Sequence, residues 1–268
     1  MIETNTFAEI TQFKLSRDFE GMAPPYWVAA YLIGGLLIDT GPEHTKHELM
    51  EAIATRKVDQ VVNTHFHEDH IGADHLLVER GLPIYAHPES IPLIADGYPL
   101  MDYQRFVWGE PVWCKTTALP LVIETENFRF EPIETPGHSV GHIALYEPTR
   151  GWCFTGDIFA RQDMKVIRPE ESIPLTIDSF RKLIALPSER LMLFTSVGKV
   201  IEDGRTVLQA TIDYLVNLAE KAQQAASQGA DVAGIVESLF GGEHPFSALT
   251  QNHYSAHNLA ASLLEVKL

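Results

Sequence analysis

The chain is poor in cysteine and has no long apolar run. Cys114 and Cys153 are its only cysteines among 268 residues, and their contexts are unrelated, so the sequence predicts neither a disulfide framework nor a zinc knuckle. No apolar run approaches the roughly 18 residues that a membrane-spanning helix needs. Residues 1–11 lack the basic start and apolar centre of a signal peptide, which favours a cytoplasmic protein without a membrane partner.

Basic residues are also scarce. The chain has 20 basic and 36 acidic residues, a formal net charge of −16, and no dense stripe of lysine and arginine. Because proteins that bind nucleic acid track the phosphate backbone with such stripes, a nucleic-acid partner is disfavoured and a small-molecule substrate is favoured. A hydrophobic fraction of 45% is enough to build a substantial core in a chain of this length.

Apolar periodicity predicts alternating strands and helices, then a second group of strands, then helices alone. The expected strands span residues 29–33, 36–39, 58–63, 84–86, 121–123, 128–134, 143–146, 153–155 and 191–195. The expected helices span residues 44–56, 71–79, 176–186, 207–228, 230–240 and 254–264. This order predicts an α+β fold, a four-layer αβ/βα sandwich in residues 1–204, with a C-terminal helical appendage in residues 205–268 packed on it.

The densest chemical signal is Thr64-His65-Phe66-His67-Glu68-Asp69-His70, directly after an apolar run that ends at Val62. It places imidazoles and a carboxylate within one short loop. Because an extended segment points residues of like parity to one face, His65 and His67 are expected to face the same way, while the following turn redirects Asp69 and His70. The loop therefore predicts a metal site with two neighbouring groups of ligands.

Other potential ligands follow other predicted strands. Thr135-Pro136-Gly137-His138 ends one strand, Gly156-Asp157 ends another, and Asp39 follows the strand that includes Leu37 and Ile38. In order, spacing and local structure this set resembles the metallo-β-lactamase superfamily over about residues 25–200. Within the superfamily, the nearest comparison is with metallohydrolases of the glyoxalase II kind, which share the motif and a helical C-terminal region.

The resemblance implies two metal positions. Its ligand set on this chain is His65, His67 and His138 for the first metal, Asp69 and His70 for the second, and Asp157 between them. Zinc is the leading metal, with one or two ions per chain, although iron and manganese accept the same donors. In such a centre zinc lowers the pKa of bound water to roughly 7, so hydroxide attacks the substrate carbonyl. The resemblance also implies that Asp69 orients the water and passes its proton on, and that Asp39 accepts an imidazole N–H behind the metal.

One position departs from the family pattern. The family usually places a histidine after the strand that corresponds to residues 191–195, and here Val197 stands in its place, followed by Gly198. Valine cannot bind a metal, which leaves three arrangements open: a weakly held second metal, a single metal with Asp69 as general base, or a substitute histidine. His253 and His257 are the candidate substitutes.

The resemblance implies an enzyme, a hydrolase of a small thioester, lactone or ester. The alternatives are a mononuclear iron enzyme of the sulfur dioxygenase type, a metal-dependent nuclease, and a degenerate member that binds without turnover. Loss of the histidine at position 197 favours the first alternative, and the acidic charge disfavours the second. Residues 96–115 are rich in aromatics with little periodicity and could line a pocket, fill an insertion or serve a homodimer.

Overall fold

The computed structural model describes residues 1–19 and 26–268, and these residues form two compact units. The first unit consists of residues 1–134, 140–160 and 188–202. The second consists of residues 135–139, 161–187 and 203–268. The segment 161–187 therefore groups with the C-terminal helices, whereas the division after residue 204 stays a prediction.

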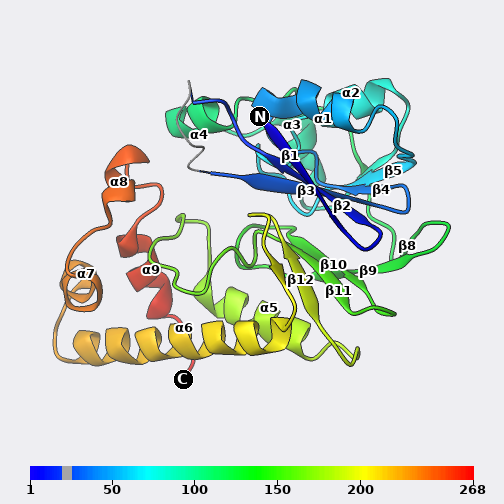
Figure 1. The fold of residues 1–268 in the computed structure, drawn as a ribbon. Helices are drawn as coiled ribbons and strands as arrows, with labels where there is room; N and C mark the ends of the chain where they lie inside the picture. Colours follow the sequence, from blue (N-terminus) through cyan, green and yellow to red (C-terminus); the bar gives the residue numbers. More distant parts are fainter. Residues whose placement is uncertain (20–25) are drawn as a thin grey trace. The chain divides into compact units, whose positions relative to one another are not determined.

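Two sheets make up the first unit (Figure 1). One sheet runs in chain order through β1 (Ile2–Phe7), β2 (Ile10–Leu15), β3 (Val28–Ile33), β4 (Leu36–Ile38), β5 (Gln60–Val62), β6 (Ile84–Ala86) and β7 (Thr117–Ala118). The other runs in the order β13 (Val200–Ile201), β12 (Met192–Thr195), β11 (Trp152–Gly156), β10 (Ile143–Glu147), β9 (Arg129–Glu134) and β8 (Ile123–Glu124). Parallel pairing of β4, β5 and β6 brings the C-terminal ends of these strands to one edge of the first sheet.

The predicted strands 29–33 and 36–39 form a hairpin that turns at Gly34-Gly35. β3 and β4 pair antiparallel with Ile33 opposite Leu36, and both glycines have positive φ angles, as the twist of a two-residue hairpin requires. A second hairpin, β1 with β2, was not predicted. Its first strand is mostly exposed and polar, with the sequence Ile-Glu-Thr-Asn-Thr-Phe, so it carries no alternation of apolar and polar residues.

The faces of the two sheets share a core. Tyr31, Ile38 and Val62 of the first sheet belong to the same buried cluster as Leu145 and Phe154 of the second. The other face of the first sheet is covered by helices, because Leu49 and Met50 of α1 (Lys46–Ala52) and Leu77 of α2 (Asp74–Glu79) pack with Phe13, Leu37 and Val61. Apolar residues on both faces of β2 to β5 explain why these strands are almost entirely buried.

Helices of the first unit are shorter than the sequence predicts. The predicted helix 44–56 is a 3₁₀ turn, η1 (Glu43–Thr45), followed by α1, and the predicted helix 71–79 begins only at Asp74. The stretch 96–115, which shows little periodicity, contains the end of α3 (Ile91–Asp96) and all of α4 (Asp102–Val107). The predicted strand 121–123 also forms later, as β8.

Gly72 holds two loops of the first unit together. Its N–H donates to the carbonyl oxygen of Gly41 at 2.7 Å, two residues beyond Asp39. A Cβ atom at Gly72 would lie 2.2 Å from the backbone nitrogen of Glu43 and 2.3 Å from the carbonyl carbon of Pro42. Because backbone atoms cannot rotate away as a side chain can, only glycine fits at this contact.

The second unit is helical outside its 135–139 segment. Its helices are α5 (Ile173–Ile184), α6 (Gly204–Ser227), α7 (Val232–Phe240), α8 (Pro245–Leu249) and α9 (Ala256–Leu263). Side-chain oxygens of Ser172, Asp203, Asp231 and Ser255 cap α5, α6, α7 and α9 by accepting backbone N–H groups, which explains where these helices begin. The short α8 was not predicted.

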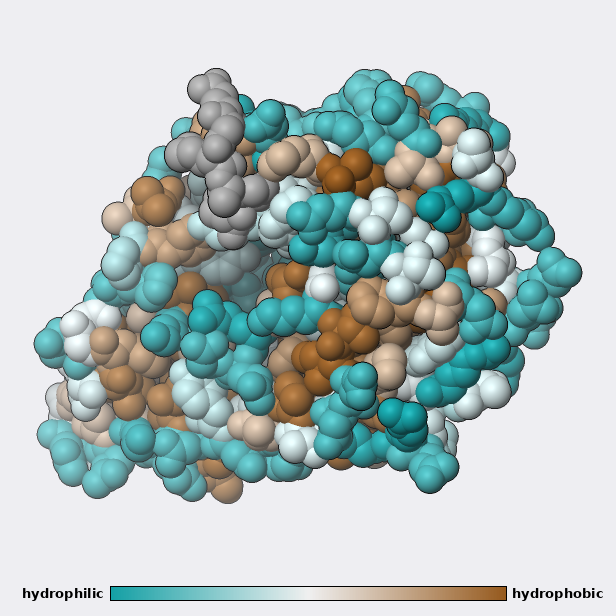
Figure 2. Space-filling model, in the orientation of Figure 1, coloured by the Kyte–Doolittle hydropathy of each residue, from teal (hydrophilic) through white to brown (hydrophobic). Residues whose placement is uncertain are grey.

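α6 is amphipathic. It buries Leu208, Ile212 and Leu215 on one face, and the surface over it in Figure 2 is mainly hydrophilic. Such a helix is stabilised by packing of its apolar stripe rather than by its length alone. Throughout the described parts of the chain, no helix combines the length and the hydropathy that crossing a bilayer would require.

Candidate metal centre

The predicted site residues of the first unit lie just beyond strand ends. Asp39 follows β4, residues 63–73 form the loop after β5, and Asp157 follows β11. His138, which is assigned to the second unit, lies in the connection between β9 and β10, which pair antiparallel with Glu134 opposite Ile143. Side chains on these connections can converge because the strands themselves are fixed by pairing and by the shared core.

Asp39 is a buried acceptor for the histidine loop. Only 2% of the residue is exposed, and its φ angle of 59° is one that residues other than glycine rarely adopt. Its carboxylate accepts the Thr64 backbone N–H at 2.7 Å, the Thr64 hydroxyl at 2.9 Å and His70 Nδ1–H at 2.8 Å. Strained backbone of this kind persists where surrounding contacts fix it, and it is concentrated at functional sites.

Asp39 thereby sets the tautomers of two histidines. His70 donates its Nδ1 proton to Asp39, so its lone pair is on Nε2. The Thr64 hydroxyl donates to Asp39 and can then accept the Nδ1 proton of His65, whose Nδ1 lies 3.0 Å away. Both imidazoles therefore present Nε2 as the atom that can bind a metal, and the role of Asp39 behind a metal stays a prediction.

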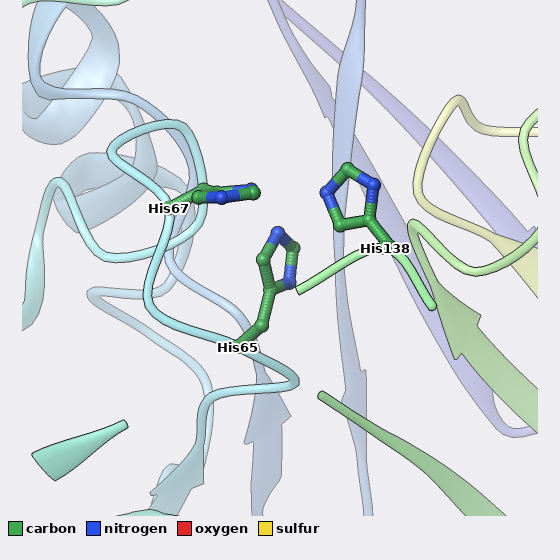
Figure 3. Close-up of side chains that lie close together, drawn as sticks. All are labelled: His65, His67 and His138. Carbon is green, nitrogen blue, oxygen red and sulfur yellow. The ribbon is translucent and has the colours of Figure 1, made fainter. Parts of the chain in front are cut away.

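Two groups of side chains within the described residues have ligand atoms within 4.8 Å of one another. They are His65, His67 and His138, and His65, His70 and Asp157. Figure 3 shows that the imidazoles of His65, His67 and His138 point toward one another. Since His65 has one lone-pair nitrogen, it can serve only one ion at a time. His65, His67 and His138 are the residues that the sequence assigns to the first metal, and that assignment stays a prediction.

In the second group, His70 is surrounded by carboxylates. His70 Nε2 lies 3.3 Å from an oxygen of Asp157 and 3.8 Å from an oxygen of Asp69. Complete burial would lower the pKa of His70, but the negative charges of Asp39, Asp157 and Asp69 raise that pKa well above its ordinary value. Carboxylates gathered around one buried imidazole favour a cation at this position, and the donor set of nitrogen and oxygen atoms suits zinc, iron or manganese.

His142 is a further histidine beside the site, in contact with Asp157. Its Nε2 accepts the backbone N–H of Asp157 at 3.1 Å, so the ring proton is on Nδ1. A Cβ atom at Gly156 would lie 2.7 Å from this nitrogen, which explains why glycine precedes Asp157. His142 therefore orients Asp157 and does not offer Nε2 to a metal.

Glu171, in the second unit, was not singled out by the sequence. One of its carboxylate oxygens accepts the Arg168 backbone N–H at 3.2 Å, and the other lies 3.6 Å from His138 Nδ1. The Ser172 N–H also donates to the Gly137 carbonyl at 2.7 Å. These contacts hold the turn that carries His138 and place a carboxylate beside its Nδ1, an arrangement that favours metal binding by Nε2.

Val197 lies in the turn between β12 and β13, where Thr195 accepts N–H groups from Gly198 and Lys199. Its side chain supplies no metal ligand. The proposed substitutes have other surroundings: Nε2 of His253 lies 3.5 Å from Glu170, and His257 is exposed on α9. Within the described residues, neither histidine belongs to a converging group of ligands.

Neither cysteine belongs to those groups, and the two thiols form no disulfide with each other. Burial raises the pKa of the Cys153 thiol to about 12, and burial together with the charge of Asp74 raises that of Cys114 to about 12. Thiols with such pKa values are protonated near neutral pH and are weak nucleophiles.

Asp74 forms a buried network beneath the histidine loop. Its carboxylate accepts the Thr40 hydroxyl at 2.7 Å and the Asn63 side-chain N–H at 2.5 Å, and 1% of the residue is exposed. Burial raises the pKa of Asp74 to about 7, against the lowering effect of both hydrogen bonds. In the unfolded chain the same carboxyl group ionises near its ordinary value of 3.8.

This difference predicts a loss of stability as pH rises. Between about pH 4 and pH 7 the unfolded chain releases the Asp74 proton while the folded chain retains it. The contribution of Asp74 to the free energy of unfolding therefore falls by about 3 kcal/mol over this range. In Asp74→Asn the amide can still accept from Asn63 and can donate to Thr40. We measure the free energy of unfolding in urea from pH 4 to 8. We expect it to fall less steeply with pH in the variant than in wild type, because the variant lacks the Asp74 carboxyl group. The control is Asp96→Asn, an exposed residue, which should show the wild-type dependence of unfolding free energy on pH. The same dependence in Asp74→Asn as in wild type would contradict the prediction.

Comparison with known proteins places these observations in a family. Residues 25–195 match the family model described as the metallo-beta-lactamase superfamily. The chain is 29% identical over 126 residues to a probable metallo-hydrolase, YybB, of Bacillus subtilis, covering 46% of this chain and 56% of that one. It is 33% identical over 131 residues to a hydroxyacylglutathione hydrolase of a Chelativorans species, covering 48% and 44%. The matches thus span about half the length of these relatives.

Solved structures show the same fold. A beta-lactamase domain protein from Burkholderia ambifaria matches with a TM-score of 0.69 and 19% identity, covering 98% of this chain and 83% of that one. A protein solved in a di-iron-bound form, TTHA1623, matches with a TM-score of 0.55 and 27% identity, covering 70% and 96%. These matches confirm the predicted fold class, a sandwich of two sheets and helices with further C-terminal helices.

Proposed function

Because this chain belongs to the metallo-beta-lactamase superfamily, we propose that it is a metal-dependent hydrolase of a small carbonyl substrate, and that a thioester is the leading class. The observation that carries the proposal is that His65, His70 and Asp157, which lie just beyond strand ends, bring their ligand atoms close together. Asp39 fixes the tautomers of the two histidines. Relatives named hydroxyacylglutathione hydrolase support the thioester class.

The side chains divide into ligands and groups that handle protons. His65, His67 and His138 would hold one metal ion, and His70 with Asp157 and Asp69 would hold a second. When bound, the metal supplies Lewis acidity and lowers the pKa of water. Asp69, 6% exposed and beside His70, would then accept and pass on a proton as the substrate bond breaks. Asp39, Thr64 and His142 would keep the ligand atoms oriented.

A mononuclear iron enzyme of the sulfur dioxygenase type is the second candidate. The observation that favours it is Val197, which leaves the second group without the imidazole that the family pattern places there. The histidine triad is unaffected by this change. Metal content separates the candidates, because a binuclear hydrolase needs two ions and the oxygenase needs one iron.

The test begins with metal content per chain, measured by inductively coupled plasma mass spectrometry on protein purified without chelator. Loaded protein is then assayed against a hydroxyacyl thioester of glutathione, a lactone, an aryl ester and a β-lactam. We expect hydrolysis of at least one of these substrates, loss of that activity with a chelator, and recovery with zinc. Hydrolysis that survives metal removal, or no hydrolysis by loaded protein, would overturn the proposal, and about one iron per chain would support the second candidate.

A further inference from the structure

Glu68 is the one acidic residue of the histidine motif to which no role has been assigned. It stands between His67 and Asp69 in the sequence, and its side chain is fully buried. Such burial of a carboxyl group is costly unless both oxygens receive hydrogen bonds. The partners of these oxygens therefore indicate what the residue does.

Both partners come from the aromatic-rich stretch 96–115. Tyr98 donates its hydroxyl to Glu68 Oε2 at 2.7 Å, and Gln104 donates its Nε2–H to Oε1 at 2.9 Å. The Tyr98 oxygen also accepts the Glu68 backbone N–H at 3.0 Å. Gln104 Oε1 accepts the Met101 N–H at 2.8 Å, which fixes the orientation of its amide so that nitrogen faces Glu68. Glu68 thus joins Tyr98 and Gln104 in one hydrogen-bond network.

Apolar packing reinforces the network. Phe66, from the same loop, belongs to a buried cluster against which Tyr98 and Trp113 pack. The Tyr98 and Phe66 rings meet edge to face at 5.0 Å, and the Tyr98 and Trp113 rings lie 5.6 Å apart. The stretch 96–115 is therefore joined to the metal-binding loop by polar and apolar contacts together, which argues against a lid that swings freely over the site.

We propose that Glu68 is a positioning residue that joins residues 98–104 to the loop carrying His67 and Asp69, so that metal occupancy and the order of residues 98–104 are coupled. The proposal rests on the proposed metal site but on no particular substrate. Because coupling of this kind is reciprocal, metal binding stabilises residues 98–104, and loosening of those residues weakens metal binding. Outer groups that orient metal ligands typically change affinity 10- to 100-fold.

The test measures metal retention and amide exchange rather than turnover. We expect Tyr98→Phe to release zinc to a competing chelator about 10-fold faster than wild type. We also expect amide hydrogens of residues 98–107 to exchange faster in this variant, and faster in wild type after metal removal. Tyr85→Phe, on β6, is the matched control and should behave as wild type. Zinc release at the wild-type rate from Tyr98→Phe would overturn the proposal.

Variants at position 68 separate positioning from general damage. Glu68→Gln keeps an acceptor for Tyr98 and should release zinc more slowly than Glu68→Met, which keeps none. Adding Tyr98→Phe to Glu68→Met should raise the release rate by a smaller factor than Tyr98→Phe does in wild type, because the carboxylate contact is already lost and only the hydrogen bond from the Glu68 backbone N–H remains to be removed. Additive effects, or Glu68→Gln and Glu68→Met with equal rates, would overturn the proposal. If metal-loaded wild type hydrolyses none of the substrates, the proposed hydrolase function fails but the positioning role of Glu68 does not, because zinc release and amide exchange are measured without substrate.

Discussion

We expect the replacement of His67 with alanine to abolish metal binding and the proposed hydrolytic activity together. The side chain is 1% exposed and its ring lies 4.6 Å from that of His65, so no other group can move into its place without repacking the loop. We expect zinc affinity to fall by more than about 100-fold, the upper range for groups that only orient a ligand. Metal content and hydrolysis are measured on the same preparation.

The control for this change is His47→Ala, an exposed histidine on α1. It removes an imidazole of equal size without touching the loop, and it should leave metal content and activity at wild-type values. Circular dichroism shows whether both variants are folded. Hydrolysis by folded His67→Ala at the wild-type rate would rule out a catalytic role for the histidine triad.

Asp69→Asn should retain the metal ion held by His65, His67 and His138 but lose most of its turnover. The amide has the shape of the carboxylate and can still accept a hydrogen bond, but it cannot take up a proton near neutral pH. General acid–base groups typically contribute 10²- to 10⁴-fold, so we expect kcat to fall by roughly 10³-fold. The measurement is kcat at several pH values, with metal content determined on the same sample.

The matched control is Asp178→Asn on α5, whose side chain is 61% exposed. It should leave kcat unchanged. If Asp69→Asn keeps its metal and turns over at the wild-type rate, Asp69 does not move the proton. If it loses all metal as His67→Ala is expected to, Asp69 acts chiefly as a ligand.

Most residues of the candidate site could be named from the sequence because they belong to local patterns at strand ends. Thr64 to His70 are adjacent in the chain, and Asp39, His138 and Asp157 each follow an apolar segment that reads as a strand. The role of Asp39 behind the metal was predicted as well, and its contact with His70 Nδ1 is consistent with it. These are short-range signals, and no tertiary information is needed to find them.

Residues that act through tertiary contacts could not be predicted in this way. Glu171 is 33 positions from His138, and Tyr98 is 30 positions from Glu68, so no spacing rule joins either pair. The hairpin of β1 and β2 was missed because its outer strand is polar and exposed, and its pairing is set by β3 on the other side. Helix starts were uncertain because turns and caps, rather than apolar periodicity, determine them.

The contact at Gly72 limits how far the histidine motif can be transplanted. The seven residues from Thr64 to His70 form a short continuous motif that could be copied into another protein. The loop after them, however, packs against the backbone of Gly41, Pro42 and Glu43. In a scaffold that receives only this motif, the loop after it has no backbone to pack against, and His70 lacks its hydrogen-bond acceptor, Asp39. A designer would need to carry over residues 39–43 and 64–74 as one discontinuous unit, with the strands that hold them in register.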